Sequence, residues 1–161
     1  MTAVTIELNG VKIADDVEPR QTLADFLRDR CGLTATHLGC EHGACGACTI
    51  LYNGEAARSC IMFAVQADGA DIVTVEGIAE GSALHPLQAA FHEHHGLQCG
   101  FCTPGMIMSA TDMIRRHPEG LDEKTVRAEL EGNICRCTGY HNIVKAILAA
   151  SQAMSGAKKA A

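Results

Sequence analysis

The stretch GCEHGACGACTI, residues 39–50, holds three cysteines and three glycines among other small residues. Thiols crowded this tightly either bond one another or hold something between them. The chain shows no basic, apolar leader and no apolar run of membrane-spanning length, which predicts a cytoplasmic protein without membrane insertion. Thiols stay reduced in that compartment, so the nine cysteines favour metal ligation over disulfides.

Four cysteines of the first half follow a C-x4-C-x2-C-x11-C pattern: Cys40, Cys45, Cys48 and Cys60. The spacing of the first three matches that of plant-type 2Fe–2S proteins. Four thiolates must converge on one small inorganic core, and glycines between them let the backbone approach it closely. Zinc prefers two short C-x2-C pairs, and only one is present here. Zinc and a disulfide pair are therefore the weaker alternatives.

A second set of four cysteines lies in the other half of the chain. QCGFCTPG supplies Cys99 and Cys102, and GNICRCTGY supplies Cys135 and Cys137. Each pair lies at the N-terminal end of a predicted helix, where the helix dipole favours thiolates. The spacing predicts a metal site and leaves the metal open. Cys31 has no cysteine at useful spacing, and we expect a buried, inert thiol there.

The two cysteine sets belong to halves of different character. The first half predicts strands joined by Asn-Gly turns at residues 9–10 and 53–54, one helix capped by Thr22, and a last strand over 71–78. Past Gly77 the signals are those of four short helices. They begin near Pro86, Thr103, Asp122 and Tyr140. The sequence predicts an α+β protein with domains over residues 1–77 and 78–161.

The bulk composition narrows the functional classes. The net charge is −6 and no run of lysine or arginine is present, which argues against nucleic-acid binding. No triad, paired carboxylates or phosphate-binding loop stands out, so no catalytic residue is predicted in this chain. Any substrate of the protein is expected to bind elsewhere.

Three motifs in order, GCEHGACGAC, QCGFCTPGMIM and GNICRCTGY, resemble the small iron–sulfur subunit of the molybdenum hydroxylases, the xanthine oxidase family. The resemblance runs from about residue 5 to residue 150. It extends to the small subunit of aerobic carbon monoxide dehydrogenase through SCIMFAVQADGADIVTVEGIA. It implies a plant-type ferredoxin-like (β-grasp) domain, then a four-helix bundle. The second 2Fe–2S cluster would then be held by Cys99, Cys102, Cys135 and Cys137.

The resemblance also implies a role. Such a subunit relays electrons from a molybdopterin centre through two 2Fe–2S clusters to FAD. The molybdopterin belongs to a large subunit and the FAD to a medium one, in an expected dimer of heterotrimers. Gln98 and Cys137 would then bind near the pterin, although Gln98 could instead cap a loop.

Some alternatives stay open from the sequence alone. The substrate of the complex could be carbon monoxide, an N-heterocycle or purine, or an aldehyde. A free-standing ferredoxin-type electron shuttle is the main alternative function. The helical half argues against it, because a shuttle has no need of that domain. A zinc-stabilised interaction module is the other alternative.

Overall fold

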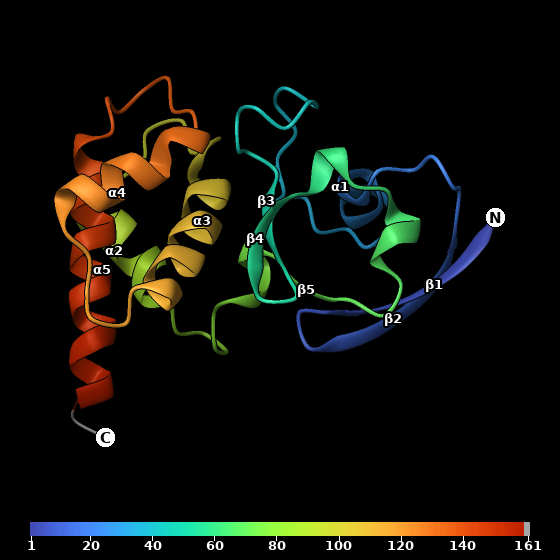
Figure 1. Ribbon diagram of the computed structural model, residues 1–161, viewed down its shortest axis with the longest axis horizontal. Helices are drawn as coiled ribbons and strands as arrows, with labels where there is room; N and C mark the ends of the chain where they lie inside the picture. Colours follow the sequence, from blue (N-terminus) through green and yellow to red (C-terminus); the bar gives the residue numbers. More distant parts are fainter. Residues whose placement is uncertain (160–161) are drawn as a thin grey trace.

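The computed structural model describes the backbone of residues 1–159 and the side chains as far as residue 155. The last two residues of the second predicted domain lie outside the described residues. Strands and one short helix occupy one side of the molecule, and the longer helices occupy the other (Figure 1). The boundary after residue 77 remains a prediction.

The sheet has five strands in the order β2-β1-β5-β3-β4. Their bounds are β1 Thr2–Leu8, β2 Val11–Val17, β3 Thr49–Tyr52, β4 Glu55–Arg58 and β5 Asp71–Val73. The Asn-Gly turns join β1 to β2 and β3 to β4, as predicted. Each turn places both of its residues at positive φ. β1 and β5 pair in parallel, and the other pairs are antiparallel.

The predicted helix after Thr22 is present but is not a regular α-helix. The Thr22 hydroxyl accepts from the backbone N–H of Asp25 and begins α1, Leu23–Asp25. The chain then widens into π-type turns over Phe26–Arg30. Gly32, at φ 72°, ends the segment. Its apolar side chains are buried under the sheet, in a core built from Ile6, Leu23, Phe26, Leu27, Ile50 and Ile72.

The last predicted strand is shorter than expected. Only Asp71–Val73 pairs with the sheet, and Val75–Gly77 forms a 3₁₀ turn instead. The side chain of Asn9 accounts for this, because it bonds the Thr74 backbone N–H and the Thr74 hydroxyl. Similar short turns occupy Ser59–Ile61 and Ala64–Ala67.

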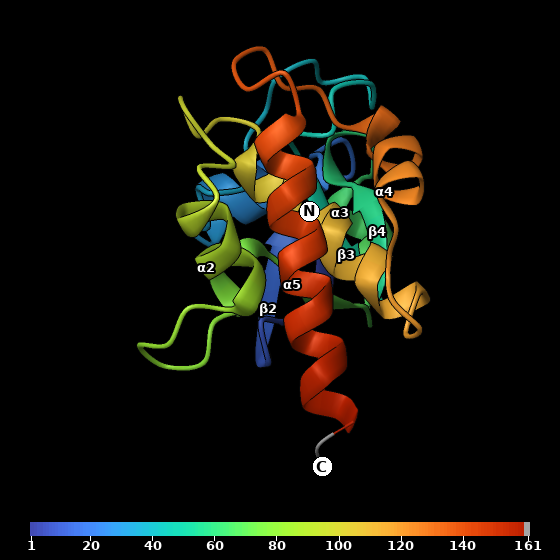
Figure 2. The ribbon, with the colours of Figure 1, turned by 90° about the vertical axis from the view of Figure 1, so that its left-hand side faces the viewer.

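Four helices form the other half, as predicted: α2 Pro86–Glu93, α3 Thr103–Arg116, α4 Glu123–Glu129 and α5 His141–Lys159. A 3₁₀ turn, Leu130–Gly132, follows α4. Viewed from this side, α5 lies in front with α2 and α4 on either side of it (Figure 2). Their shared core includes Leu87, Phe91, Met106, Ile143 and Ile147. None of the helices described here is long and apolar enough to cross a membrane.

Helix α3 joins the two halves, because it packs against β3 and β4. A Cβ on Gly105 would lie only 2.2 Å from the Gly46 carbonyl oxygen, so glycine lets the helix backbone reach the start of β3. The long loop before β3 and the loop before α5 consequently emerge at the same end of the molecule (Figure 1). The ferredoxin-like sheet followed by a helical bundle confirms the predicted fold class.

Candidate metal centres

The first cysteine set is assembled from two segments. Cys40, Cys45 and Cys48 lie on the long loop before β3, and Cys60 lies in the 3₁₀ turn after β4. Ser59 joins the segments, since its hydroxyl donates to the Cys48 carbonyl oxygen over 2.8 Å. Cys48 and Cys60 are buried, whereas Cys40 and Cys45 are half-buried. The set therefore has an inner and an outer pair of thiols.

The two pairs differ in electrostatics. Backbone N–H groups of His42 and Cys45 lower the pKa of the Cys40 thiol to about 6. The N–H of Cys45 lies 3.3 Å from the Cys40 sulfur. Burial, followed by the neighbouring Cys48 thiol, raises the pKa of Cys60 to about 11. The Cys40 thiol therefore ionises easily, whereas the Cys60 thiol favours its protonated form until a metal binds it.

The glycines of this loop are required by its shape. Gly43 and Gly46 have φ of 83° and 76°, a conformation that side chains disfavour. A Cβ on Gly39 would lie 3.1 Å from the Cys45 sulfur. On Gly46 it would lie 2.5 Å from the Gly132 carbonyl oxygen. The loop leaves space around its sulfurs that larger residues would fill, which fits an enclosed inorganic cluster.

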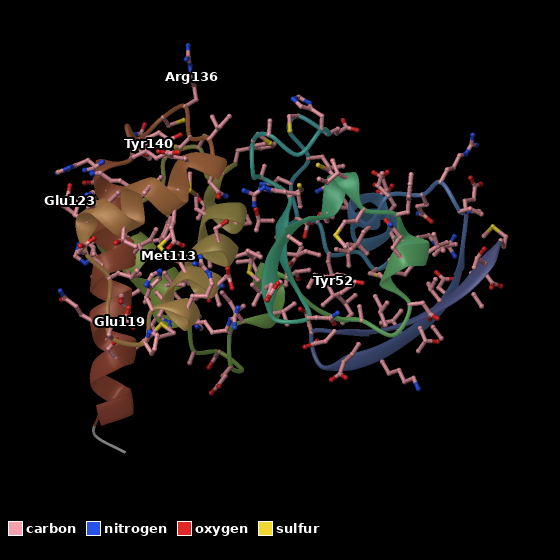
Figure 3. All side chains as sticks on the ribbon, viewed as in Figure 1. Tyr52, Met113, Glu119, Glu123, Arg136 and Tyr140 are labelled. Atoms are coloured by element: carbon pink, nitrogen blue, oxygen red, sulfur yellow. The ribbon has the colours of Figure 1, made fainter. Side chains whose placement is uncertain are left out.

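The second set comes from the N-terminal end of α3 and from the loop before α5. Cys102 is the N-cap of α3, and Cys135 and Cys137 lie on the loop before α5. The sulfurs of Cys99 and Cys137 are 3.4 Å apart, and both residues are exposed. Figure 3 shows Arg136 pointing outward from the tip of this loop, with Tyr140 lying beneath it. The structure thus brings the C-x2-C and C-x-C segments together at this pair.

The inner pair of the second set is Cys102 and Cys135. Burial, then the adjacent Cys135 thiol, raises the pKa of Cys102 to about 12. Burial also acts to raise the pKa of Cys135, but hydrogen bonds from the Thr138 side chain and backbone lower it below its usual range. Both sets therefore combine an easily ionised thiol with one that stays protonated without a metal.

The pairwise arrangement bears on the kind of metal. Within the described residues no group of three or more His, Cys, Asp or Glu side chains converges on one ion position. A 2Fe–2S cluster takes two protein ligands on each of its two irons. The approach of Cys60 to Cys48 and of Cys99 to Cys137 fits such an arrangement.

A polar bridge connects the two cysteine loops. The backbone N–H of Ile134 donates to the Cys45 carbonyl oxygen over 2.8 Å. Asn133 is buried, and its amide donates to the Gly46 carbonyl while its oxygen accepts from Ser109. Arg58 donates to the carbonyl oxygen of Gly132 over 2.7 Å. These bonds fix the position of each loop relative to the other.

The structure brings together the two residues predicted to lie near a pterin. Gln98 Nε2 donates to the Cys137 carbonyl oxygen over 3.2 Å, and both residues are exposed. Cys31, by contrast, packs against the strand-half core away from both sets. The sequence predicted a buried thiol at Cys31, but the residue is half-buried, because it lies at the end of the π-type segment. Burial, then Asp15, raises its pKa, which fits an unreactive thiol.

Sequence reasoning missed Asn133, Thr138 and Tyr140 as parts of the site. All three lie in or next to the GNICRCTGY motif, which was interpreted for its cysteines alone. A hydroxyl directly after the last cysteine was the available signal for Thr138. The roles of Asn133 and Tyr140 depend on contacts that no local sequence pattern predicts.

Two four-thiol sets, one on a ferredoxin-like sheet domain and one on a helical bundle, define the class of iron–sulfur electron-transfer proteins. Two protein-family models that match the chain support this class. The model described as "2Fe-2S iron-sulfur cluster binding domain" matches residues 6–72. The model described as "2Fe-2S binding domain" matches residues 74–148.

Related chains narrow the class to a family. The chain is 52% identical to the caffeine dehydrogenase subunit gamma of a Pseudomonas species, over 96% of this chain and 94% of the relative. It is 53% identical to the nicotine 6-hydroxylase small subunit of Paenarthrobacter nicotinovorans, over 90% of this chain and 87% of the relative. A quinoline 2-oxidoreductase structure from Pseudomonas putida 86 superposes with a TM-score of 0.91 at 47% identity, covering 94% of each chain. The chain belongs to the small iron–sulfur subunits of the molybdenum hydroxylases.

Proposed function

We propose that this chain is the electron-relay subunit of a heteromeric molybdenum hydroxylase, with ligands assigned residue by residue. One 2Fe–2S cluster would be held within residues 1–77 and the other within residues 78–161. The proposed ligands are Cys40, Cys45, Cys48 and Cys60 for the first, and Cys99, Cys102, Cys135 and Cys137 for the second. The observation that carries the proposal is the approach of cysteine side chains in both sets: Cys60 to Cys48, Cys102 to Cys135, and Cys99 to Cys137.

Each 2Fe–2S cluster, when bound, takes up and releases one electron. The chain supplies the burial and the hydrogen bonds around each proposed cluster. Its buried thiols, Cys48 and Cys60, keep water from one side of the first centre. Backbone N–H groups near Cys40 stabilise negative charge on sulfur. The bridge between Ile134 and Cys45 keeps the two centres at a fixed separation.

The exposed edge formed by Gln98, Cys99 and Cys137 is proposed to face the molybdopterin of a large subunit. Exposure supports this, since two thiol ligands at the surface need a partner to exclude water. The chain would take electrons at this edge and deliver them from the plant-type centre to FAD on a medium subunit. A dimer of such heterotrimers in the cytoplasm completes the proposal.

The relatives support a proposal for the substrate class of the whole complex. Chains that share about half of their residues with this one belong to enzymes named for caffeine and nicotine, both N-heterocycles. The aldehyde oxidoreductase subunit of Escherichia coli is 41% identical. We therefore propose an N-heterocycle as substrate, in preference to an aldehyde or carbon monoxide.

Purification of the tagged chain from its native host tests the function. We expect two larger chains to co-purify, with molybdenum and FAD present beside iron. The complex should reduce an electron-acceptor dye with an N-heterocycle and not with an aldehyde or carbon monoxide. A chain that purifies alone with its iron in place would favour the ferredoxin-type shuttle and contradict the proposal. Identification of the large chain would settle the substrate.

A further inference from the structure

The hydroxyl of Thr138 lies beside a proposed cluster ligand. Its Oγ1 is 3.2 Å from the sulfur of Cys135. The same oxygen lies 3.1 Å from the backbone nitrogen of Tyr140, which donates to it. Thr138 is half-buried, so these contacts are partly shielded from water.

The direction of the bond to sulfur follows from counting protons. A threonine hydroxyl has one proton and two lone pairs. The Tyr140 N–H already occupies one lone pair, which leaves the proton free for another partner. A cysteine that ligates metal is a thiolate with no proton to give. Thr138 must therefore donate to the Cys135 sulfur.

The loop geometry holds this donor in place. Gly139 and Tyr140 both have positive φ, 64° and 67°, which turns the Tyr140 N–H back toward Thr138. The Tyr140 hydroxyl accepts from the Cys135 backbone N–H over 2.9 Å and donates to the Asn133 carbonyl. A left-handed tyrosine is strained, and the surrounding bonds keep it so. The arrangement aims one hydroxyl at one sulfur.

The two proposed centres differ in whether a side-chain hydroxyl bonds a cysteine sulfur. In the first set the Cys40 sulfur accepts from a backbone N–H, that of Cys45. Across residues 1–155, Thr138 is the one side chain other than cysteine within hydrogen-bond distance of a cysteine sulfur. A change at Thr138 should consequently affect one centre and leave the other as an internal reference.

We propose that Thr138 sets the reduction potential of the helical-domain centre by donating its hydroxyl proton to the Cys135 sulfur. This inference rests on the proposed ligand role of Cys135. Reduction adds negative charge to the cluster and its sulfurs, and a hydrogen bond strengthens as its acceptor becomes more negative. The hydroxyl stabilises the reduced form more than the oxidised form, so it raises the potential.

The test is a redox titration of the purified holoprotein, followed by low-temperature EPR. Three variants are compared: Thr138→Val, Thr138→Ala and Thr138→Ser. In Thr138→Val and Thr138→Ala, we expect the oxidised-to-reduced ratio of the helical-domain centre at fixed potential to rise up to about tenfold. A tenfold change corresponds to about 59 mV toward more negative potential for one electron. Thr138→Ser keeps the hydroxyl and should stay near the wild-type value.

Two controls separate a tuning role from general damage. The plant-type signal of the same sample should not move. Thr111→Val removes a hydroxyl that bonds the Ile107 carbonyl inside α3, away from sulfur, and should leave both midpoints unchanged. A shift of both centres together in Thr138→Val would overturn the proposal.

The remaining outcomes are equally decisive. Wild-type midpoints in both Thr138→Val and Thr138→Ala would overturn the proposal. So would loss of the helical-domain signal in both variants with its retention in Thr138→Ser, because the hydroxyl would then serve assembly. A wild-type protein without two distinct signals would overturn the proposed function itself. A one-centre shift with serine rescue is the result we expect.

Discussion

The backbone N–H of Ile134 donates to the carbonyl oxygen of Cys45 over 2.8 Å. Cys45 belongs to the first cysteine set, and Ile134 directly precedes Cys135 of the second. One hydrogen bond therefore joins the two loops that carry the proposed ligands. The buried amide of Asn133, which bonds Gly46, holds the same contact. The two halves of the chain meet at their cysteine loops, as a relay between two centres requires.

Gly46→Ala should break this contact. The residue has positive φ, and its new Cβ would lie 2.5 Å from the Gly132 carbonyl oxygen, which is backbone and cannot move alone. We expect the strain of the left-handed backbone, about 1–2 kcal/mol, plus an overpacking cost of about 1–3 kcal/mol. Iron content and thermal unfolding of the holoprotein measure both effects.

Gly54→Ala is the matched control for that variant. Gly54 has φ 85°, and a Cβ added to it would have no neighbour within 4 Å, so only the backbone strain applies. The substitution should lower the Tm by a few degrees and keep the full iron content. Equal losses in Gly46→Ala and Gly54→Ala would show that the approach of the two loops does not matter.

Cys48→Ser should damage the plant-type centre and spare the helical-domain centre. Cys48 is buried beside Cys60 in the first set, whereas Cys31 packs against the strand-half core outside both sets. Cys31→Ser should therefore leave both EPR signals of the reduced protein intact. Loss of either signal in Cys31→Ser would contradict the ligand assignment.

His117 should make stability depend on pH. Hydrogen bonds to Glu129, then to Glu119, raise the pKa of its imidazole above the usual value of about 6.5. A raised folded pKa adds stability that is complete below the unfolded pKa and is lost as the pH rises through the folded one. The difference in Tm between wild type and His117→Gln should be largest near pH 6 and shrink toward alkaline pH. A difference that grows with pH would refute this pairing.

Gln98→Ala should slow reduction of the helical-domain centre in the assembled enzyme, or weaken pterin binding, while both clusters still assemble. Gln98 lies at the exposed edge and already holds the Cys137 carbonyl. Rapid-freeze EPR after mixing with substrate measures the reduction rate, and pterin analysis measures the cofactor. Unchanged rate and cofactor content would leave Gln98 with the loop-capping role alone.

Local signals in the sequence predicted much of this molecule. The cysteine spacings, the Asn-Gly turns and the cap at Asp122 each act within a few residues, so a single sequence displays them. The turns and caps that these signals produce depend little on distant parts of the chain. The four helix starts were predicted for the same reason.

Contacts between residues far apart in the chain could not be predicted from the sequence. The parallel pairing of β1 with β5 joins residues more than sixty positions apart, and no local pattern specifies it. The bond from Asn133 to Gly46 spans 87 positions. The donor role of Thr138 needs two successive left-handed residues, one of them a tyrosine, which propensity would not suggest.

We propose that the chain binds two 2Fe–2S clusters on two separate cysteine sets. Iron, acid-labile sulfide and zinc analysis of anaerobically purified protein tests it most directly. Two clusters of two irons each require four iron and four sulfide per chain. We expect those values, together with two distinct EPR signals on reduction. Stoichiometric zinc, or half that iron, would contradict it.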